Sequence, residues 1–415
     1  MSTTTTTKLT TTSMTTIKIK APDSIVSAEI DLPISKSIVS RLLMLWPEKT
    51  LDWLSQHDDW CDDIRVMMVV MRKMIETDGN PTSSEVVLDV HASGTAMRFL
   101  TALCSVKSGV WVLRGTTRLC ERPIRCLVDA LRSVGADIEY LDKEGFLPLK
   151  IRGNDTLEGG RIEIDASESS QYVSALMMVA QHFKRGLEIS RVGDGVSTPY
   201  VKMTASLLKK SANDISELIE YDWSAAAFWY EMKFIADKIG RECGEISLKG
   251  LNYENSLQGD KAIVDILESL NSHRQTDGCV VMDFRDTPDL VVAVAVSCCL
   301  GNIPFVMTGV KNLRIKETDR IDALCKELNK MGYVVSGSSD EIIWEGIYTK
   351  PLSPVRIQTY SDHRMAMAFA PCALKFGEIE IVNPEVVEKS YPLFWDNLQK
   401  LGFDIEITEL NAESN

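Results

Sequence analysis

One pattern recurs six times along this chain: a short cluster of polar residues followed at once by a helix-length apolar segment. The copies begin about 55 to 75 residues apart. They read PISKSIVSRLLMLW (33–46), ASGTAMRFLTALC (92–104), SESSQYVSALMMVA (167–180), YDWSAAAFWYEMKFIA (221–236), DTPDLVVAVAVSCC (286–299) and TYSDHRMAMAFAPCAL (359–374). A helix that is apolar nearly all round must be buried. The repetition therefore limits the chain to a fold of similar units, each built on a buried helix with a polar start.

Amphipathic helices and glycine-ended turns fill the intervals between these segments. Gly135, Gly332 and Gly402 each follow a helical pattern and precede alternating β-branched or aromatic residues, which predicts a helix end and then a strand. The amphipathic segments are ERPIRCLVDALRSV (121–134), TPYVKMTASLLKK (198–210), DKAIVDILESL (260–270), KETDRIDALCKELNK (316–330) and KSYPLFWDNLQKL (389–401). The repeating unit is therefore strand, buried helix, strand, amphipathic helix and two strands.

Six such units predict an α/β protein of two domains, each with three β-α-β-α-β-β units around buried helices, in an inside-out α/β barrel. We expect a disordered Thr-rich tail at 1–16 and a first domain at 34–222. The second domain would combine 17–33 with 223–415. The third unit is truncated, because SANDISELIE (211–220) follows the helix that ends near Lys210 and leads directly into the fourth unit. About two strands are missing there.

Charge and cysteine content exclude several classes of protein. The formal net charge is −14, which argues against a nucleic-acid surface, since such a surface would be basic. No apolar run reaches the 18 residues of a membrane span. The ten cysteines form no CxxC pair or zinc-spaced cluster. We expect buried, reduced thiols and a cytoplasmic protein without metal.

Positive residues stand at the predicted helix starts, where free backbone N–H groups and the helix dipole favour anions. Any one of them would also suit a solvated helix end or a cap. If they converge, they would bind a ligand with several negative charges, such as phosphate plus carboxylate. The seven are Lys36, Arg41, Arg122, Lys316, Arg320, Arg364 and Lys389.

Two carboxylates and several neutral groups share these helix starts. Asp289 and Glu317 should stay ionised among cations, which suits a general base, and Glu317 would need its pKa tuned to act as an acid. Gly94 permits close approach of a ligand to the backbone. Ser37, Ser169, Ser170 and Gln171 supply neutral hydrogen-bonding groups.

These motifs resemble the 5-enolpyruvylshikimate-3-phosphate synthase family. The resemblance covers nearly the whole chain beyond the Thr-rich tail, and KETDR (316–320) together with DHRMAM (362–367) is its most specific part. Further pieces in family order are SKSIVSR, SGTAMR, ERPI, SSQ, STPY, DWSAA, LQGD, TPD, NLRIKETDR and EKSYP. The resemblance implies a two-domain transferase of chorismate and aromatic amino-acid biosynthesis. It would move enolpyruvyl from phosphoenolpyruvate to the 5-hydroxyl of shikimate 3-phosphate without a cofactor, as a monomer.

The resemblance also implies residue roles. Shikimate 3-phosphate would be held by Ser37, Arg41, Ser169, Ser170, Ser197 and Lys316, and oriented by Gln171, Tyr200 and Asn312. Phosphoenolpyruvate would be held by Lys36, Arg122, Arg320, Arg364 and Lys389, with Gly94 giving its phosphate room. Asp289 would be the base on the 5-hydroxyl, and Glu317 the acid that protonates the methylene group. Lys36 would assist at the reacting centre.

Two other functions remain open at this point. The sister enolpyruvyl transferase that acts on UDP-N-acetylglucosamine typically carries a loop cysteine, and Cys120 lies in RLCERPI. The truncated third unit would also suit an inactive binder of phosphorylated metabolites. A nucleotide-binding kinase is less favoured, because neither GxxxxGK[ST] nor GxGxxG is present.

Overall fold

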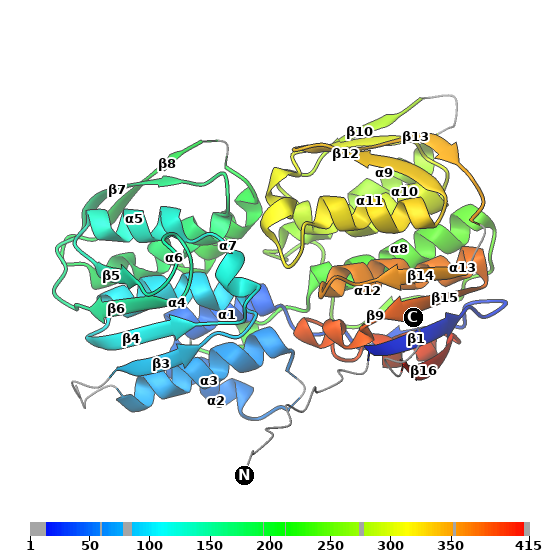
Figure 1. The fold of residues 1–415 in the computed structure, drawn as a ribbon. Helices are drawn as coiled ribbons and strands as arrows, with labels where there is room; N and C mark the ends of the chain where they lie inside the picture. The colour runs from blue at the N-terminus through cyan, green and yellow to red at the C-terminus, as the bar shows by residue number, and fades with distance from the viewer. Residues whose placement is uncertain are drawn as a thin grey trace, which may run out of the picture.

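A computed structural model describes residues 14–58, 60–77, 85–193, 195–211, 213–273, 278–351 and 354–410. Within these ranges, no helix has both the length and the apolar character needed to span a membrane. The described elements form a mixed α/β protein, and none of its sheets closes into a barrel. Figure 1 shows two groups of helices and sheets side by side, which we call the first and second domains.

The six apolar segments all form buried helices. The surrounding residues explain where they begin, because Ser93, Ser169, Asp222 and Asp362 each accept a hydrogen bond from a backbone N–H of the first turn. The helices are α1 (Lys36–Leu45), α4 (Gly94–Val106), α6 (Ser170–Val179), α8 (Trp223–Ile239), α10 (Val291–Leu300) and α12 (His363–Phe369).

Three four-stranded sheets share one topology, in which two parallel strands are followed by two antiparallel neighbours. The first contains β3 (Val86–Asp89), β4 (Gly109–Arg114), β6 (Leu149–Gly153) and β5 (Asp137–Tyr140), in that spatial order. The second contains β10 (Val280–Asp283), β11 (Phe305–Thr308), β13 (Glu341–Tyr348) and β12 (Tyr333–Gly337). The amphipathic helices α5 (Arg125–Ser133) and α11 (Arg320–Lys330) connect the parallel strands to the antiparallel pairs.

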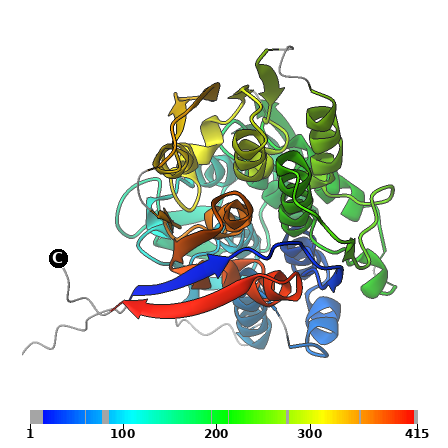
Figure 2. The same cartoon turned by 90° about the vertical axis from the view of Figure 1, so that its right-hand side faces the viewer.

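The N-terminal strand completes the third of these sheets. Its spatial order is β14 (Val355–Gln358), β15 (Glu378–Val382), β1 (Met14–Lys20) and β16 (Asp404–Leu410), so β1 takes the place that β6 and β13 take in the other two. Figure 2 shows β1 beside β16, and Thr16 pairs with Thr408 in antiparallel register. Short helices α13 (Ala373–Phe376) and α14 (Phe394–Lys400) complete this unit. The first described strand therefore packs with the last one.

The other three units are reduced. In the third unit only β7 (Gly160–Asp165) and β8 (Leu187–Val192) pair, followed by α7 (Thr198–Leu207), and the described residues show no further strands there, as the sequence predicts. The fourth unit has β9 (Ile246–Leu248), which pairs with β2 (Ala28–Ile30), and α9 (Ile263–Ser272).

The first unit departs from the expected pattern most clearly. Here α1 is followed by α2 (Pro47–Leu54) and α3 (Asp62–Thr77), where a strand was expected between helices. Pro47 is the first residue of α2, a position where its fixed φ favours a helix. Between α3 and β3 the described residues show no strand. The full six-element unit therefore occurs three times among the described residues.

Separate apolar clusters support the division into two domains. One large cluster runs from Val39 to Phe183, and another joins Ile17–Leu32 to residues 223–403. The chain passes from one domain to the other near residue 34 and again near residue 222, and these two connections are hydrogen-bonded to each other. Ser35 N donates to Glu220 O at 2.8 Å, and Asp222 N donates to Pro33 O at 2.8 Å. The domain boundaries at 33/34 and 222/223 stay a prediction, which the pairing of these two connections supports.

Three boundaries differ from expectation. The strand β1 begins at Met14, so residues 14–16 belong to it and not to a disordered tail; residues 1–13 lie outside the described ranges. Pairing with β16 supplies the backbone hydrogen bonds that extend it. Helix α11 begins at Arg320 with Asp319 as its cap, so Lys316 and Glu317 lie in the preceding turn. Helix α5 likewise begins at Arg125, after Arg122 and Pro123.

Candidate functional site

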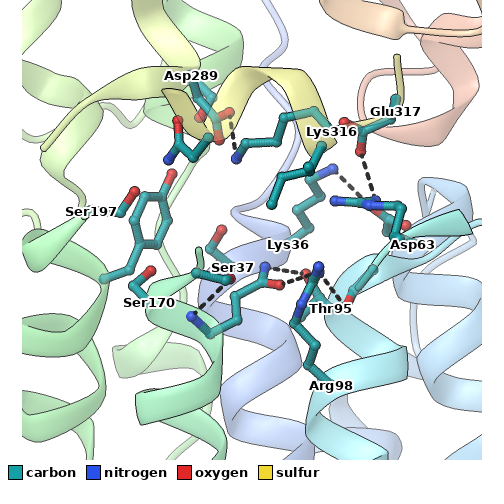
Figure 3. A pocket seen from close by; sticks show the side chains of 18 of the residues that line it. Lys36, Ser37, Asp63, Thr95, Arg98, Ser170, Ser197, Asp289, Lys316 and Glu317 are labelled. Atoms are coloured by element: carbon teal, nitrogen blue, oxygen red, sulfur yellow. Dashed lines mark hydrogen bonds and ion pairs between the residues drawn. The ribbon is translucent and has the colours of Figure 1, made fainter. Parts of the chain in front are cut away.

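A polar cavity of about 90 Å³ lies where the two domains face each other. Helix starts surround it: those of α1, α4, α6 and α7 from the first domain, and those of α8, α11 and α12 from the second. Figure 3 shows Lys36, Ser37 and Ser170 on one side and Asp289, Lys316 and Glu317 on the other. Unpaired N–H groups at so many helix starts favour an anionic ligand.

Arg41 is a buried cation held by neutral groups. Its side chain is 1% exposed, and Nε donates to Thr204 Oγ1 at 2.7 Å. Its two Nη groups donate to Ser37 O at 2.7 Å, and to Ser174 Oγ and Tyr200 O at 3.2 Å each. Burial lowers the pKa of Arg41 to about 10. Among the described residues no carboxylate pairs with it, so an anionic ligand would supply the missing negative charge.

At the start of α4, two guanidinium groups lie close to the backbone of Gly94. A Cβ atom on Gly94 would lie 2.7 Å from Arg122 Nη1 and 2.8 Å from Arg98 Nη1, closer than real contacts allow. Arg98 Nη1 donates to Gln171 Oε1 at 3.0 Å, and Gln171 Nε2 donates to Thr95 Oγ1 at 2.9 Å. A side chain at this position would therefore push the two guanidinium groups away from the first turn of the helix.

Asp289 lies at the centre of three cations. It accepts from Arg320 Nη1 at 2.8 Å and from Lys316 Nζ at 3.4 Å, and Arg364 Nη2 is 3.1 Å from its Oδ2. Burial opposes ionisation, but Arg364, Lys316 and Arg320 outweigh it and hold the pKa of Asp289 well below the ordinary value. Asp289 is thus a carboxylate in the ligand-free protein and can accept a proton.

Glu317 has its own set of cations. Arg320 Nη2 lies 2.9 Å away, Lys389 Nζ 3.1 Å and Arg122 Nη1 3.7 Å. Burial again opposes ionisation, but Lys389, Arg122 and Arg320 hold the pKa of Glu317 well below the ordinary value. Arg320 joins the two carboxylates, because its Nη1 donates to Asp289 and its Nη2 donates to Glu317. Its Nε also donates to the buried Asp362 at 2.7 Å.

Lys36 pairs with an acid that the sequence analysis did not single out. Its Nζ lies 2.6 Å from Asp63 Oδ2, in the first turn of α3, and both side chains are largely buried. Burial would lower the pKa of Lys36, but Asp63 raises it overall; burial would raise the pKa of Asp63, but Lys36 lowers it overall. The ion pair therefore keeps Lys36 charged at the edge of the cavity.

His363 also lies in the wall of the cavity and is 2% exposed. Neither ring nitrogen has a hydrogen-bond partner among the described residues. Burial, with Lys36 and Arg364 nearby, holds the pKa of His363 well below its ordinary value, so the ring is neutral.

The structure brings the sequence-predicted site residues together. Those that line the cavity are Lys36, Ser37, Arg41, Gly94, Arg122, Ser169, Ser170, Gln171, Ser197, Tyr200, Asp289, Asn312, Lys316, Glu317, Arg320 and Arg364. Lys389 does not line it directly; its ammonium group binds Glu317 and donates to Ala92 O at 3.1 Å. Residues as far apart in the chain as Lys36 and Arg364 thus share one site.

Other lining residues were not assigned in the sequence. They are Asp63, Thr95, Arg98, Glu168, Asp222, Ser224, Ile315 and His363. Thr95, Arg98 and His363 stand inside the recognised motifs, so adjacency within a motif was an available signal. For Asp63 the only signal in the sequence was its place in the acidic first turn of α3. The adjacent Asp62 has the same signal and does not line the cavity, so the sequence could not have distinguished the two.

A family model described as EPSP synthase (3-phosphoshikimate 1-carboxyvinyltransferase) matches residues 20–223 and 212–398. A 3-phosphoshikimate 1-carboxyvinyltransferase of Bacteroides fragilis is 39% identical over 423 residues, covering 94% of this chain and 99% of that protein. The protein of the same name from Haemophilus influenzae is 32% identical over 434 residues, covering 92% and 98%. An EPSP synthase structure from Acinetobacter baumannii has a TM-score of 0.65 at 20% identity, covering 95% and 100%, which is a likeness of fold.

Proposed function

The chain belongs to the EPSP synthase family, and on this premise we propose that it transfers enolpyruvyl from phosphoenolpyruvate to the 5-hydroxyl of shikimate 3-phosphate, releasing phosphate. The observation that carries the proposal is the pair of ionised carboxylates, Asp289 and Glu317, inside one cation-rich cavity. Both proposed substrates carry a phosphate and a carboxylate, which matches such a cavity in charge.

The first-domain wall suits shikimate 3-phosphate. Arg41 has no carboxylate partner among the described residues, and Ser169, Ser170 and Ser197 stand at the starts of α6 and α7. In this proposal Ser37, Arg41, the three serines and Lys316 hold the ligand, and Gln171, Tyr200 and Asn312 orient it. Asn312 is 5% exposed and its Oδ1 has no partner among the described residues, so a ligand hydroxyl can satisfy it.

The opposite corner suits phosphoenolpyruvate. Its phosphate and carboxylate would take over the cations that now pair with Asp289 and Glu317, and Gly94 lets the Arg122 guanidinium lie close to the start of α4, where the phosphate would bind. The residues proposed to hold it are Lys36, Arg122, Arg320, Arg364 and Lys389. Each cation has a protein partner in the ligand-free form, which keeps the charges in place before the ligand arrives.

Proton transfer follows from these charges. Asp289 accepts the proton of the 5-hydroxyl, and Glu317 gives a proton to the methylene carbon, which leaves a cationic C2 that the oxygen attacks. Glu317 is ionised in the ligand-free form; anionic phosphoenolpyruvate beside it would engage its cations and raise its pKa, so that it can carry the proton. Glu317 then removes a methyl proton as the C–O bond to phosphate breaks.

The alternative function, enolpyruvyl transfer to UDP-N-acetylglucosamine, was favoured mainly by Cys120, and the position of this cysteine does not support it. Cys120 is half-buried and does not line the cavity, and its Sγ lies 3.7 Å from Gly115 O. Burial raises the pKa of its thiol, which disfavours the reactive thiolate. This cysteine is therefore better explained as a structural residue.

A phosphate-release assay tests the proposal. The purified chain is mixed with phosphoenolpyruvate and either shikimate 3-phosphate or UDP-N-acetylglucosamine, and the product is identified by mass spectrometry. We expect phosphate release with shikimate 3-phosphate alone. Turnover only with the nucleotide sugar would replace the proposed acceptor, and binding of both ligands by calorimetry without turnover would favour the inactive binder. Oligomeric state and cytoplasmic location stay predictions.

A further inference from the structure

The segment that carries Lys316 and Glu317 has little backbone support of its own. Residues 316–318, here called the catalytic turn, connect a 3-10 helix (Lys311–Ile315) to Asp319, the cap of α11. Among the described residues, no backbone–backbone hydrogen bond reaches this turn. Buried or partly buried carbonyl groups need a donor, so the Lys316 and Glu317 carbonyls must be satisfied by side chains or water.

One side chain from the other domain supplies both donors. Arg118 Nε donates to Glu317 O at 2.8 Å, and Arg118 Nη2 donates to Lys316 O at 3.1 Å. Its third group, Nη1, donates to Glu121 Oε2 at 2.8 Å, which orients the guanidinium from the side away from the turn. A planar guanidinium matches two adjacent acceptors in a way that a single ammonium group does not.

The same first-domain segment also contacts the Glu317 side chain. Arg122, four residues after Arg118, places Nη1 3.7 Å from Glu317 Oε1. Residues 118–122 therefore touch Glu317 at its carbonyl and at its carboxylate. The distance between the two domains at this point sets the position of the catalytic turn relative to the cavity.

We infer that Arg118 is a positioning residue: it holds the catalytic turn from across the domain boundary, so that Glu317 is placed for proton transfer only while the two domains are in contact. The inference rests on the proposed function for its kinetic consequence. Its structural part, that Arg118 immobilises residues 316–318, depends only on the contacts described above.

The test compares Arg118→Ala with a matched control, Arg114→Ala. Both arginines are exposed, at 44% and 59% of the side chain, and Arg114 pairs with Asp89 inside the first domain at 3.2 Å, away from the turn. We expect Arg118→Ala to lower kcat by about 10- to 100-fold, since small misplacements of a reacting group have effects of this size. Affinity for shikimate 3-phosphate, measured by calorimetry, and the thermal midpoint should match those of the control. Arg118→Lys should recover part of kcat.

A second measurement does not depend on turnover. Limited trypsin digestion, followed by mass spectrometry, reports how often the turn opens at the Lys316–Glu317 bond. We expect cleavage there to be several-fold faster in Arg118→Ala than in the parent and in Arg114→Ala.

Faster cleavage together with lower kcat supports the inference. Unchanged cleavage, with or without a fall in kcat, overturns it, and so does faster cleavage with parent-like kcat. A parent that releases no phosphate from the two substrates defeats the proposed function separately. In that case the cleavage comparison alone decides whether Arg118 holds the turn.

Discussion

Replacing Glu317 by glutamine removes the proposed proton donor while keeping the size of the side chain. The amide cannot carry a proton to the methylene carbon or take one from the methyl group. General acid–base catalysis contributes about 10²- to 10⁴-fold, so kcat should fall by that factor, which corresponds to about 3–5 kcal/mol in the activation free energy.

The structure predicts that binding and folding survive this change. Arg320 keeps Asp289 at 2.8 Å and Asp362 at 2.7 Å, and Lys389 keeps the Ala92 carbonyl at 3.1 Å. Arg122 loses its carboxylate partner, so the free energy of unfolding should fall by about 2 kcal/mol. Since the removed charge no longer competes for Arg122 and Lys389, the affinity for phosphoenolpyruvate should equal or exceed that of the parent.

Phosphate release under saturating substrates gives kcat, and calorimetry gives the affinity for shikimate 3-phosphate. Glu144→Gln is the matched control, because Glu144 is an exposed acid that pairs with Arg125 at 2.6 Å in the first domain. A Glu317→Gln protein with kcat within a few-fold of the Glu144→Gln control would refute the acid/base role. If Glu317→Gln lost all ligand binding, the claim that Glu317 is needed for proton transfer and not for substrate binding would be refuted.

Three further predictions follow from the cation-lined walls of the cavity. Arg122→Ala should raise the apparent KM for phosphoenolpyruvate about 10-fold or more and leave that for shikimate 3-phosphate near the parent value; an unchanged KM for phosphoenolpyruvate would count against the assigned role. Gly94→Ala should have a similar effect, because the new Cβ would lie 2.7 Å from Arg122 Nη1 and 2.8 Å from Arg98 Nη1 and would displace both groups; titrations of the two substrates would detect it. Burial would raise the pKa of Asp63, but Lys36 lowers it overall, so this ion pair stabilises the fold above the ordinary carboxyl pKa of 3.8 and the stabilisation is lost as pH falls below that value. The gap between the thermal midpoints of the parent and Asp63→Asn at pH 7 should therefore shrink as pH falls below 3.8, and a gap independent of pH would exclude this linkage.

Local sequence pattern was sufficient for the repeated helices and for most of the site. Each buried helix was visible because its apolar residues leave no polar face, and Gly332 and Gly402 marked helix ends through a left-handed conformation that other residues rarely adopt. The site residues were visible because they cluster at helix starts, where backbone N–H groups lack partners. Their assigned roles came from resemblance to a family and stay proposals.

Contacts between distant segments decided the remainder. Strand β1 extends to Met14 because β16 offers it hydrogen bonds, which the Thr-rich sequence does not reveal. Pro47 starts a helix in the first unit where the repeat predicted a strand, since the first unit packs without strands of its own among the described residues.

The amino-acid sequence by itself determined which segments are buried helices and which charged residues stand at their starts, because both depend on neighbours within one or two helical turns. Only the tertiary structure decided which cation meets which carboxylate. Asp63 and not Asp62 binds Lys36, and Arg118 reaches the carbonyls of Lys316 and Glu317 almost 200 residues away. Such pairings depend on how distant segments and the two domains pack against each other. The spacing of residues along the chain carries no information about which of them become neighbours in space.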